Sequence, residues 1–450
     1  MSLLLDLLYL AALALASPWL AYRLAITGGW RLIPARVGAG LAPRASECLW
    51  LHGSSVGEVS LLRPLVARLE RDMPHAELVI SSYTQTGVAA ARAAYPRHTV
   101  VVFPLDFSFV VKRFLRRLKP RLVIIVESEL WPNFLAVSRR CGVPAVVVNG
   151  KMSEKSFAIH RRTRVIARAI KGLRMLAVQS DEHARRFRSL GVPEGIIRVT
   201  GNMKYDLAPP AGGRAARSGL RAKLGYAPDE TVVIGGSLHT GEDAALLEAC
   251  AALDGGGARI ALILAPRYPA DAAEVCRRVR GAGSEPVLKS EVDRGARAPG
   301  SRGVLVVDTV GELDRLYSAA DIAFVGGSLF YRGANKGGHN LMEPAILGLP
   351  VLFGPYNFSF KDTVSDLLAA RGGMLVRDGA ELQRALGALV RDRVSREEMG
   401  ERARGVVLQG QGATARNFAL IERLIDECEA RLQAPAANRT MPQAATDHRA

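Results

Sequence analysis

Short apolar segments alternate with amphipathic ones along most of this 450-residue chain, and this alternation constrains the fold more than any other feature. In the first half, the strand-like segments are residues 48–52, 78–82, 100–103, 122–126, 145–149, 174–179 and 197–200. Between them, segments such as 60–71 and 110–118 have the periodicity of amphipathic helices. Such alternation predicts a parallel α/β sheet that binds ligands at the carboxyl ends of its strands.

The same alternation restarts after residues 207–219, whose sequence LAPPAGGRAARSG has the composition of a linker. The strand-like segments that follow are TVVIGGS, RIALILAP, GVLVVDT, IAFVGGS and PVLFGP. We therefore expect two doubly wound domains, residues 27–206 and 220–412, with a cleft between them. A helix is predicted over 413–432, and residues 433–450 have the composition of a disordered tail.

The N-terminal stretch is strongly apolar, and residues 3–22 carry one charge, Asp6. This length is close to the ~20 residues that a membrane-spanning helix needs. Arginines at positions 23, 31, 36 and 44 follow it, which by the positive-inside rule places the rest of the chain in the cytoplasm. We therefore predict a membrane anchor helix over 1–26. A helix lying flat in the interface is the alternative, because Asp6, Ser17 and Pro18 weaken a span.

Charge is divided unevenly along the chain. Residues 1–206 contain 30 Lys and Arg against 14 Asp and Glu, whereas residues 207–450 contain 30 against 29. A basic half next to an apolar helix indicates that the chain binds an anionic membrane surface or an anionic lipid substrate, although a basic face exposed only to solvent would have the same composition. No nucleic-acid-binding motif accompanies the charge. Five scattered cysteines without a C-x-x-C pair favour buried thiols in a reducing compartment.

The stretch HGSSVGE, residues 52–58, directly follows the first predicted strand and allows three interpretations. Gly53 to Gly57 fit the G-x-S-x-G nucleophile elbow of serine hydrolases, with Ser55 as the nucleophile. Ser55 and Glu58 fit the S-x-x-E capping box, which is purely structural. Alternatively, Glu58 performs acid–base chemistry at a strand-to-helix turn, where the helix start favours the ionised form that a base requires.

Other charged residues follow later strands of the first half. In ESELWPN, Glu127 and Glu129 come directly after a strand and are either cleft residues or solvated turn residues. Lys151 and Ser153 follow the next strand, and Lys204 follows the last one. Lysines that converge past strand ends predict a binding site for anionic groups.

The second half contains glycine-rich turns suited to phosphate. VVIGGSLHTGED (232–243) and the stretch 321–360 both place glycines between a strand and a helix, where backbone N–H groups can hold a phosphate or simply form a tight turn. Arg267 lies just past a strand end, where its guanidinium can bind a phosphate. In the second stretch a helix opens at residues 341–343, where Glu343 is placed to bind ribose hydroxyls. Neither a Walker A loop nor G-x-G-x-x-G is present.

Six motifs occur together: HGSSVGE, ESELWPN, GNMKYD, GSLHTGE, APRYP and GGHNLMEP…GLPVLFGP. In order and spacing they resemble bacterial Kdo transferases, the 3-deoxy-D-manno-octulosonic acid transferases of lipopolysaccharide synthesis. The resemblance runs from the N-terminal segment to about residue 420. It implies a GT-B fold of two Rossmann-like domains, with the acceptor bound mainly by the first and the donor by the second. It also implies inverting transfer of Kdo from CMP-Kdo to lipid IVA, a tetraacylated lipid A precursor, without a metal or cofactor at the inner membrane.

The resemblance further implies roles for single residues. Glu58 matches the general base that deprotonates the acceptor hydroxyl, and Glu127 matches a second cleft carboxylate. The residues expected to hold CMP are Ser237, His239, Thr240, Gly241, Arg267, Gly338, His339, Asn340 and Glu343. We expect the acceptor and its anionic groups to contact Ser55, Lys151, Ser153 and Lys204. Departures from the family pattern are Tyr268 for a common histidine, Lys151 for Arg or Ala, Leu238 for Thr or Ile, and the longer loop FYRGANK (330–336).

Three other functions remain as alternatives. Other GT-B enzymes, such as lipid A disaccharide synthase and peptidoglycan N-acetylglucosaminyl transferase, use UDP donors. A serine hydrolase would need an HGGG-type oxyanion segment before Ser55, and the sequence has none. A non-catalytic membrane-bound adaptor is disfavoured by the intact carboxylates and phosphate loops. We expect the serines to cap the turn and Glu58 to carry the chemistry.

Overall fold

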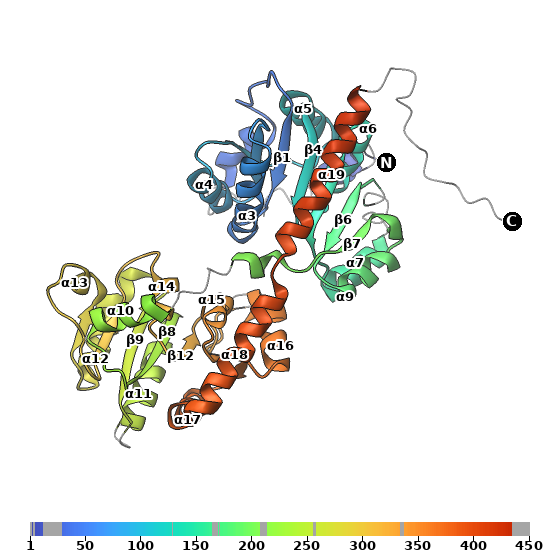
Figure 1. Cartoon of the computed structure of the whole chain (residues 1–450). Helices are drawn as coiled ribbons and strands as arrows, with labels where there is room; N and C mark the ends of the chain where they lie inside the picture. The colour runs from blue at the N-terminus through green and yellow to red at the C-terminus, as the bar shows by residue number, and fades with distance from the viewer. Residues whose placement is uncertain are drawn as a thin grey trace. The chain divides into compact units, whose positions relative to one another are not determined.

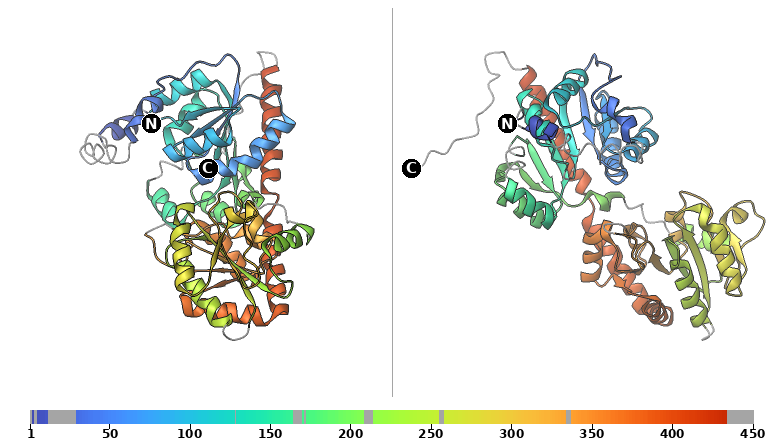
Figure 2. Two further views of the ribbon diagram at one scale, coloured as in Figure 1. Left: turned by 90° about the vertical axis from the view of Figure 1, so that its left-hand side faces the viewer. Right: turned by 180° about the vertical axis from the view of Figure 1, so that it is seen from behind.

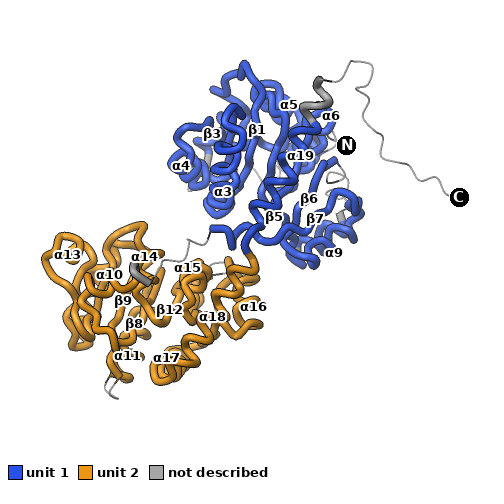
Figure 3. The backbone as a smooth tube through the Cα atoms, viewed as in Figure 1, with its two compact units in different colours: residues 1–207, 411–450 blue, residues 208–410 orange. Residues whose placement is uncertain are grey.

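The computed structural model describes residues 2, 5–11, 29–127, 129–163, 170, 172–207, 214–254, 258–333 and 337–433. The chain forms two compact units, one of residues 1–207 and 411–450 and the other of residues 208–410 (Figures 1 and 3). Each unit is built on its own seven-stranded sheet, and every strand pair in both sheets is parallel. Two doubly wound α/β units, as predicted from the alternation, are therefore present.

The first sheet has the strand order β3-β2-β1-β4-β5-β6-β7. Its strands are β1 (Cys48–His52), β2 (Leu78–Ser82), β3 (Thr99–Val102), β4 (Pro120–Val126), β5 (Ala145–Gly150), β6 (Met175–Val178) and β7 (Ile197–Val199). The chain begins at the inner strand β1 and continues through β2 to the edge strand β3. It then crosses back to β4, on the other side of β1, and continues to the opposite edge strand β7. The switch point of this topology lies between β1 and β4, where α/β sheets bind their ligands.

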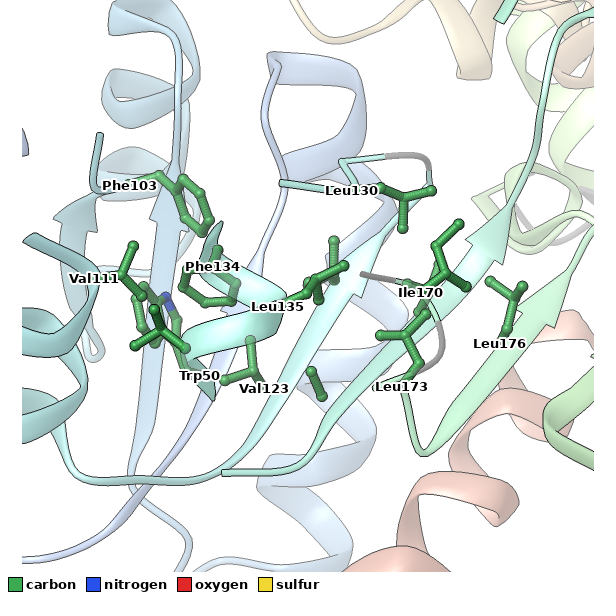
Figure 4. Packing of buried hydrophobic residues seen from close by; sticks show 14 of the residues in the cluster. Trp50, Phe103, Val111, Val123, Leu130, Phe134, Leu135, Ile170, Leu173 and Leu176 are labelled. Carbon is green, nitrogen blue, oxygen red and sulfur yellow. The ribbon is translucent and has the colours of Figure 1, made fainter. Parts of the chain in front are cut away.

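Helices cover both faces of the first sheet. They are α2 (Ile33–Arg36), α3 (Val56–Asp72), α4 (Gln85–Ala94), α5 (Ser108–Leu118), α6 (Pro132–Arg140), α7 (Glu154–Thr163), α9 (Asp181–Ser189) and α19 (Ala413–Gln433). One face packs on α5, α6 and α9 around Trp50, whose ring centroid lies 5.3 Å from that of Phe134 (Figure 4). The other face packs on α3 and on α19, which contributes Phe418 and Ile421 (Figures 1 and 2). The helix predicted over 413–432 therefore belongs to the first unit.

The second sheet repeats this topology in the order β10-β11-β9-β8-β12-β13-β14. Its strands are β8 (Thr231–Leu238), β9 (Ile260–Pro266), β10 (Pro286–Leu288), β11 (Val304–Val306), β12 (Ile322–Val325), β13 (Val351–Phe353) and β14 (Gly373–Leu375). Its helices are α10 (Arg214–Leu224), α11 (Glu242–Asp254), α12 (Ala272–Gly281), α13 (Lys289–Asp293), α14 (Leu313–Tyr317), α15 (Met342–Ile346), α16 (Lys361–Ala369), α17 (Gly379–Arg391) and α18 (Arg393–Gly410). Its switch point lies between β8 and β12.

The linker predicted over 207–219 is wrong in its second half. Residues 208–213 lie outside the described residues, but α10 begins at Arg214. Its sequence RAARSGLRAKL is rich in good helix formers, and Leu220 and Leu224 are buried in the second unit. The prolines and glycines that suggested a linker all precede this helix, except Gly219.

The described part of the N-terminal segment, residues 5–11, is helical and belongs to the first unit. Its one charge is buried rather than exposed to solvent: Asp6 accepts hydrogen bonds from the backbone N–H of Ser108 (3.0 Å) and from Nδ2 of Asn133 (2.8 Å). Among the described residues, no helix has the length and apolarity needed to cross a membrane. Most of the predicted anchor, including residues 12–28, lies outside the described residues.

Candidate active site

The turn between β1 and α3 is an N-terminal helix cap built from two serines and a glutamate. Ser55 is the N-cap of α3, and its Oγ donates to Oε1 of Glu58 (3.0 Å) while accepting from the Glu58 backbone N–H (3.4 Å). The backbone N–H of Ser54 donates to Oε2 (2.8 Å). A Cβ at Gly53 would lie 2.8 Å from the carbonyl carbon of Glu58, so the tight approach requires glycine. The capping prediction is confirmed.

The environment of Glu58 raises its pKa to about 7. Burial is the main cause, and the negative charges of Glu127 and Glu129 add to it, whereas the hydrogen bonds from the two serines oppose it. The helix start was expected to favour the ionised form; the hydrogen bonds of the cap act in that direction, but burial outweighs them, so the pKa rises. A carboxyl group with a pKa near 7 is well suited to take a proton at neutral pH.

A second carboxylate lies at the end of β4, the strand next to β1 across the switch point. Glu127 is buried and has a backbone φ of +63°, a left-handed conformation that is uncommon for a residue with a side chain. Its Oε2 forms an ion pair with Nζ of Lys151 at the end of β5 (2.8 Å). The pKa of Glu129 is raised as well, mainly by burial. The topology thus brings together the carboxylates that the sequence placed after β1 and β4.

The predicted anion-binding residues of the first unit differ in their surroundings and in their partners. Lys151 is half-buried and pairs with Glu127, so its charge is shared with a carboxylate. Ser153 is exposed, and its hydroxyl caps the start of α7 through the backbone N–H of Ser156 (3.2 Å). Lys204 lies partly buried in the 3₁₀ turn Met203–Leu207. Of these residues, Lys151 has the clearest place beside the carboxylates.

In the second unit, two imidazoles from opposite sides of the switch point meet. Nε2 of His239, after β8, lies 3.0 Å from Nε2 of His339, in the loop after β12, and the rings are nearly parallel. The pKa of both histidines is lowered, mainly by burial, and that of His339 falls to about 4. The charges of Arg267 and Arg332 lower both pKa values further. Both rings are therefore neutral at pH 7, so one N–H donates to the other ring's nitrogen.

The other residues expected to hold CMP surround this pair on three loops. Ser237 has a φ of +54° at the end of β8, and Thr240 and Gly241 follow it before α11. Arg267 is exposed, and its backbone N–H donates to the carbonyl of Leu238 (2.8 Å). Beside His339, the backbone N–H of Gly338 donates to the carbonyl of Gly327 (2.7 Å), and Nδ2 of Asn340 donates to Oε1 of Glu343 (3.0 Å). Burial raises the pKa of Glu343.

In the glycine turns of the second unit, several backbone N–H groups that were expected to face a phosphate bond to carboxylates of the protein instead. The N–H groups of His239, Gly327, Ser328 and Leu329 all donate to the carboxylate of Glu242. The N–H of Gly241 donates to Asp243. Sequence reasoning placed Glu242 at a helix start without giving it a role. Its position as the first residue of α11, directly after the glycine turn, was the available signal.

The hydrolase interpretation has no support in the described residues. Ser55 uses its hydroxyl to cap α3 and to donate to Glu58. The nucleophilic serine of a G-x-S-x-G hydrolase instead needs a histidine as its hydrogen-bonded base, and in the described part of the chain no histidine bonds to this hydroxyl. Glu58 remains the candidate base.

Comparison with known proteins decides the family. A sequence model of the family described as 3-deoxy-D-manno-octulosonic-acid transferase (kdotransferase) matches residues 31–207. The 3-deoxy-D-manno-octulosonic acid transferase of Bordetella pertussis is 34% identical over 429 residues, covering 90% of this chain and 95% of that protein. The chain belongs to the Kdo transferase family. The Haemophilus influenzae transferase of the same name is 30% identical over 381 residues, covering 84% of this chain and 87% of that protein.

Solved structures agree on the fold of this Kdo transferase. MurG of Acinetobacter baumannii has a TM-score of 0.53 at 13% identity, covering 84% of this chain and 99% of that chain. HepE of Anabaena, in complex with UDP, has a TM-score of 0.52 at 16% identity, covering 85% and 100%. At such identities the likeness concerns the fold alone. The resemblance stated from six motifs, and the GT-B fold it implied for the two α/β units, are confirmed.

Proposed function

We propose that this Kdo transferase transfers Kdo from CMP-Kdo to lipid IVA, with inversion and without a metal, at the cytoplasmic face of the inner membrane. The observation that carries the chemistry is Glu58, a partly buried carboxyl group with a pKa of about 7 at the switch point of the first sheet. An alcohol is a weak nucleophile, so it needs a base whose pKa lies close to the working pH.

The proposed step is a single displacement. Glu58 takes the proton of the acceptor hydroxyl while the hydroxyl oxygen bonds to the anomeric carbon of Kdo. The bond from that carbon to the phosphate oxygen of CMP breaks, and the phosphate leaves with the electron pair. Attack on the face opposite the leaving group inverts the anomeric centre. Glu127, paired with Lys151, lies beside Glu58 and adds to the burial that raises the pKa of Glu58.

Charge supports the proposed acceptor. Residues 1–206, which form nearly all of the first unit outside α19, carry 30 basic against 14 acidic residues. Lipid IVA is a bisphosphorylated glycolipid, so a basic acceptor-binding unit would attract it and hold it at an anionic membrane surface. The exposed side chains of Leu7, Leu8 and Leu10 on the N-terminal helix support contact with that surface.

The proposed donor accounts for the second unit. Arg267 and the imidazole pair are groups that can bind one phosphate, and Glu343 with Asn340 offers polar groups that can bind ribose hydroxyls. If the enzyme used a UDP sugar instead, UDP would raise the midpoint of thermal unfolding more than CMP. We expect CMP to give the larger shift, because the nearby groups suit a single phosphate.

Mass spectrometry of the product formed from CMP-Kdo and lipid IVA tests the function directly, and the anomeric configuration by NMR tests inversion. We expect a mass increase of one or more Kdo residues, unchanged by a metal chelator. Glu58→Gln should lower kcat by about 10²- to 10⁴-fold without weakening CMP binding. Glu70→Gln, a carboxylate change in the same helix, is the matched control. Absence of product while the wild-type chain binds both substrates would contradict the proposal.

A further inference from the structure

Glu242 is almost fully buried, with 1% of its surface exposed, and its carboxylate accepts four backbone N–H groups. Oε2 accepts from His239 (2.9 Å) and Gly327 (2.7 Å), and Oε1 accepts from Ser328 and Leu329 (both 2.9 Å). Backbone N–H groups that converge in this way form anion-binding nests. Here the anion that fills the nest is a side chain of the protein itself.

The four N–H groups come from two different loops. One follows β8 and the other follows β12, the neighbouring strands on either side of the switch point. Glu242 therefore ties together the two strand ends between which the donor is proposed to bind. The backbone of the loop after β12 comes very close to the Glu242 carboxylate, since a Cβ at Gly326 would lie 2.6 Å from Oε2 of Glu242. Glycine at this position is what allows the second loop to reach the carboxylate.

Both imidazoles of the donor site depend on this carboxylate. His239 is held directly, through its own backbone N–H. His339 is held through Gly327, whose carbonyl accepts the N–H of Gly338 (2.7 Å), the residue before His339. A Cβ at Gly327 would also lie 2.8 Å from the His339 ring, so this ring rests against the tethered loop.

We propose that Glu242 is the positioning residue of the donor site: its carboxylate holds His239 and His339 at hydrogen-bonding distance to receive the phosphate of a nucleoside monophosphate. The donor role of the pair rests on the proposed function. Glutamine cannot take the place of Glu242, because one oxygen becomes an NH₂ group and two backbone N–H donors then face another donor. Unsatisfied buried donors are strongly unfavourable, so the two loops would separate.

The chain offers a matched control in Glu230. This glutamate is also buried, and it accepts hydrogen bonds from the backbone N–H of Ala227 (2.9 Å) and the hydroxyl of Ser301 (3.0 Å). It directly precedes β8, at the end of the sheet opposite the donor loops. Glu230→Gln therefore disturbs a comparable buried network in the same unit and leaves the imidazole pair in place.

The experiment compares full-length wild type, Glu242→Gln and Glu230→Gln. Without nucleotide, hydrogen exchange measured by mass spectrometry should show lost protection in peptides covering 239–242 and 326–329 only in Glu242→Gln. Calorimetry should show CMP binding weakened by about tenfold in Glu242→Gln and changed less than twofold in Glu230→Gln. In the transfer assay, the KM for the donor should rise in Glu242→Gln while the KM for the acceptor stays constant.

Unchanged CMP affinity and unchanged loop protection in Glu242→Gln would overturn the proposal. If this variant does not fold, Glu242→Asp provides the test, because it keeps the charge but shortens the side chain. Its CMP affinity should then lie between that of wild type and the tenfold weaker affinity expected for Glu242→Gln. An affinity equal to that of wild type would refute the positioning role. If the wild-type chain does not bind CMP, the proposed donor is wrong. The hydrogen exchange result still reports separately whether Glu242 holds the two loops.

Discussion

Replacing Glu58 by glutamine should stabilise the protein at alkaline pH while it removes activity. The native environment raises the pKa of Glu58 from 4.5 to about 7, which means that the folded chain binds this proton more tightly than the unfolded chain does. The native state therefore loses stability as the pH rises from about 4.5 to about 7, and the whole loss is present above pH 7. Glutamine carries no ionisable group and avoids this loss.

The expected magnitude follows from the pKa and the hydrogen bonds. A pKa that moves from 4.5 to about 7 corresponds to about 3 kcal/mol between the ionised and neutral forms, which partial exposure to water reduces to about 2 kcal/mol. The capping contacts survive, because the glutamine oxygen can accept from the Ser54 N–H and its NH₂ can donate to Ser55 Oγ. Loss of the cap should therefore not offset the gain.

Urea unfolding of wild type and Glu58→Gln at pH 5 and pH 8 measures the effect. The free energy of unfolding should differ little at pH 5 and by about 2 kcal/mol in favour of the variant at pH 8. The transfer rate at pH 8 should fall by two orders of magnitude or more in the same variant, roughly the contribution of a general base. A stability difference that does not depend on pH, or a variant less stable at pH 8, would refute the assigned burial of the charge.

Three further predictions concern the neighbouring groups. Gly327→Ala should weaken CMP binding about tenfold by calorimetry, because its Cβ would lie 2.8 Å from the His339 ring; Gly283→Ala has a similar positive φ with open space around it and should leave CMP binding unchanged. Lys151→Ala should move the acidic midpoint of the pH profile of kcat to higher pH by about 0.5, because Glu127 without its lysine partner would raise the pKa of Glu58 further. An unchanged midpoint would contradict this. The pKa of His339 is lowered from 6.5 to about 4, so the folded protein loses stability as the pH falls between these values. The midpoint of thermal unfolding should therefore fall less between pH 7 and pH 5 in His339→Asn than in wild type.

Much of the fold could be predicted because the strands of a doubly wound sheet are buried on both faces. Strands such as β1 and β2 therefore appear in the sequence as short apolar runs, and their predicted bounds, 48–52 and 78–82, agree with the structure. The start of α10 was missed because the proline and glycine residues just before it dominated the composition of the segment. Local composition marks a boundary less accurately than a buried strand.

The candidate site was predicted in part for the same reason. Glu58, in the first turn of the helix after β1, and Glu127, directly after β4, come close because parallel strands end at one edge of the sheet. The pKa of Glu58 could not be predicted, since it depends on burial by distant parts of the chain. The use of the glycine turns was missed because the acceptor of the Gly327 N–H, Glu242, lies 85 residues away in the sequence.

The two units use one local pattern for opposite purposes. Glu58 and Glu242 both lie in the first turn of the helix that follows the first strand of a sheet, and both carboxylates turn back toward the strand end. Glu58 receives one backbone N–H and one hydroxyl and stays partly exposed, so its oxygens can still take a proton from a substrate. Glu242 receives four backbone N–H groups and is sealed from solvent, so its oxygens hold protein rather than substrate. If the two proposed roles hold, a base and a positioning residue differ here in the number of N–H groups that the neighbouring strand end supplies, and a glutamate at a helix start in the sequence does not contain that information.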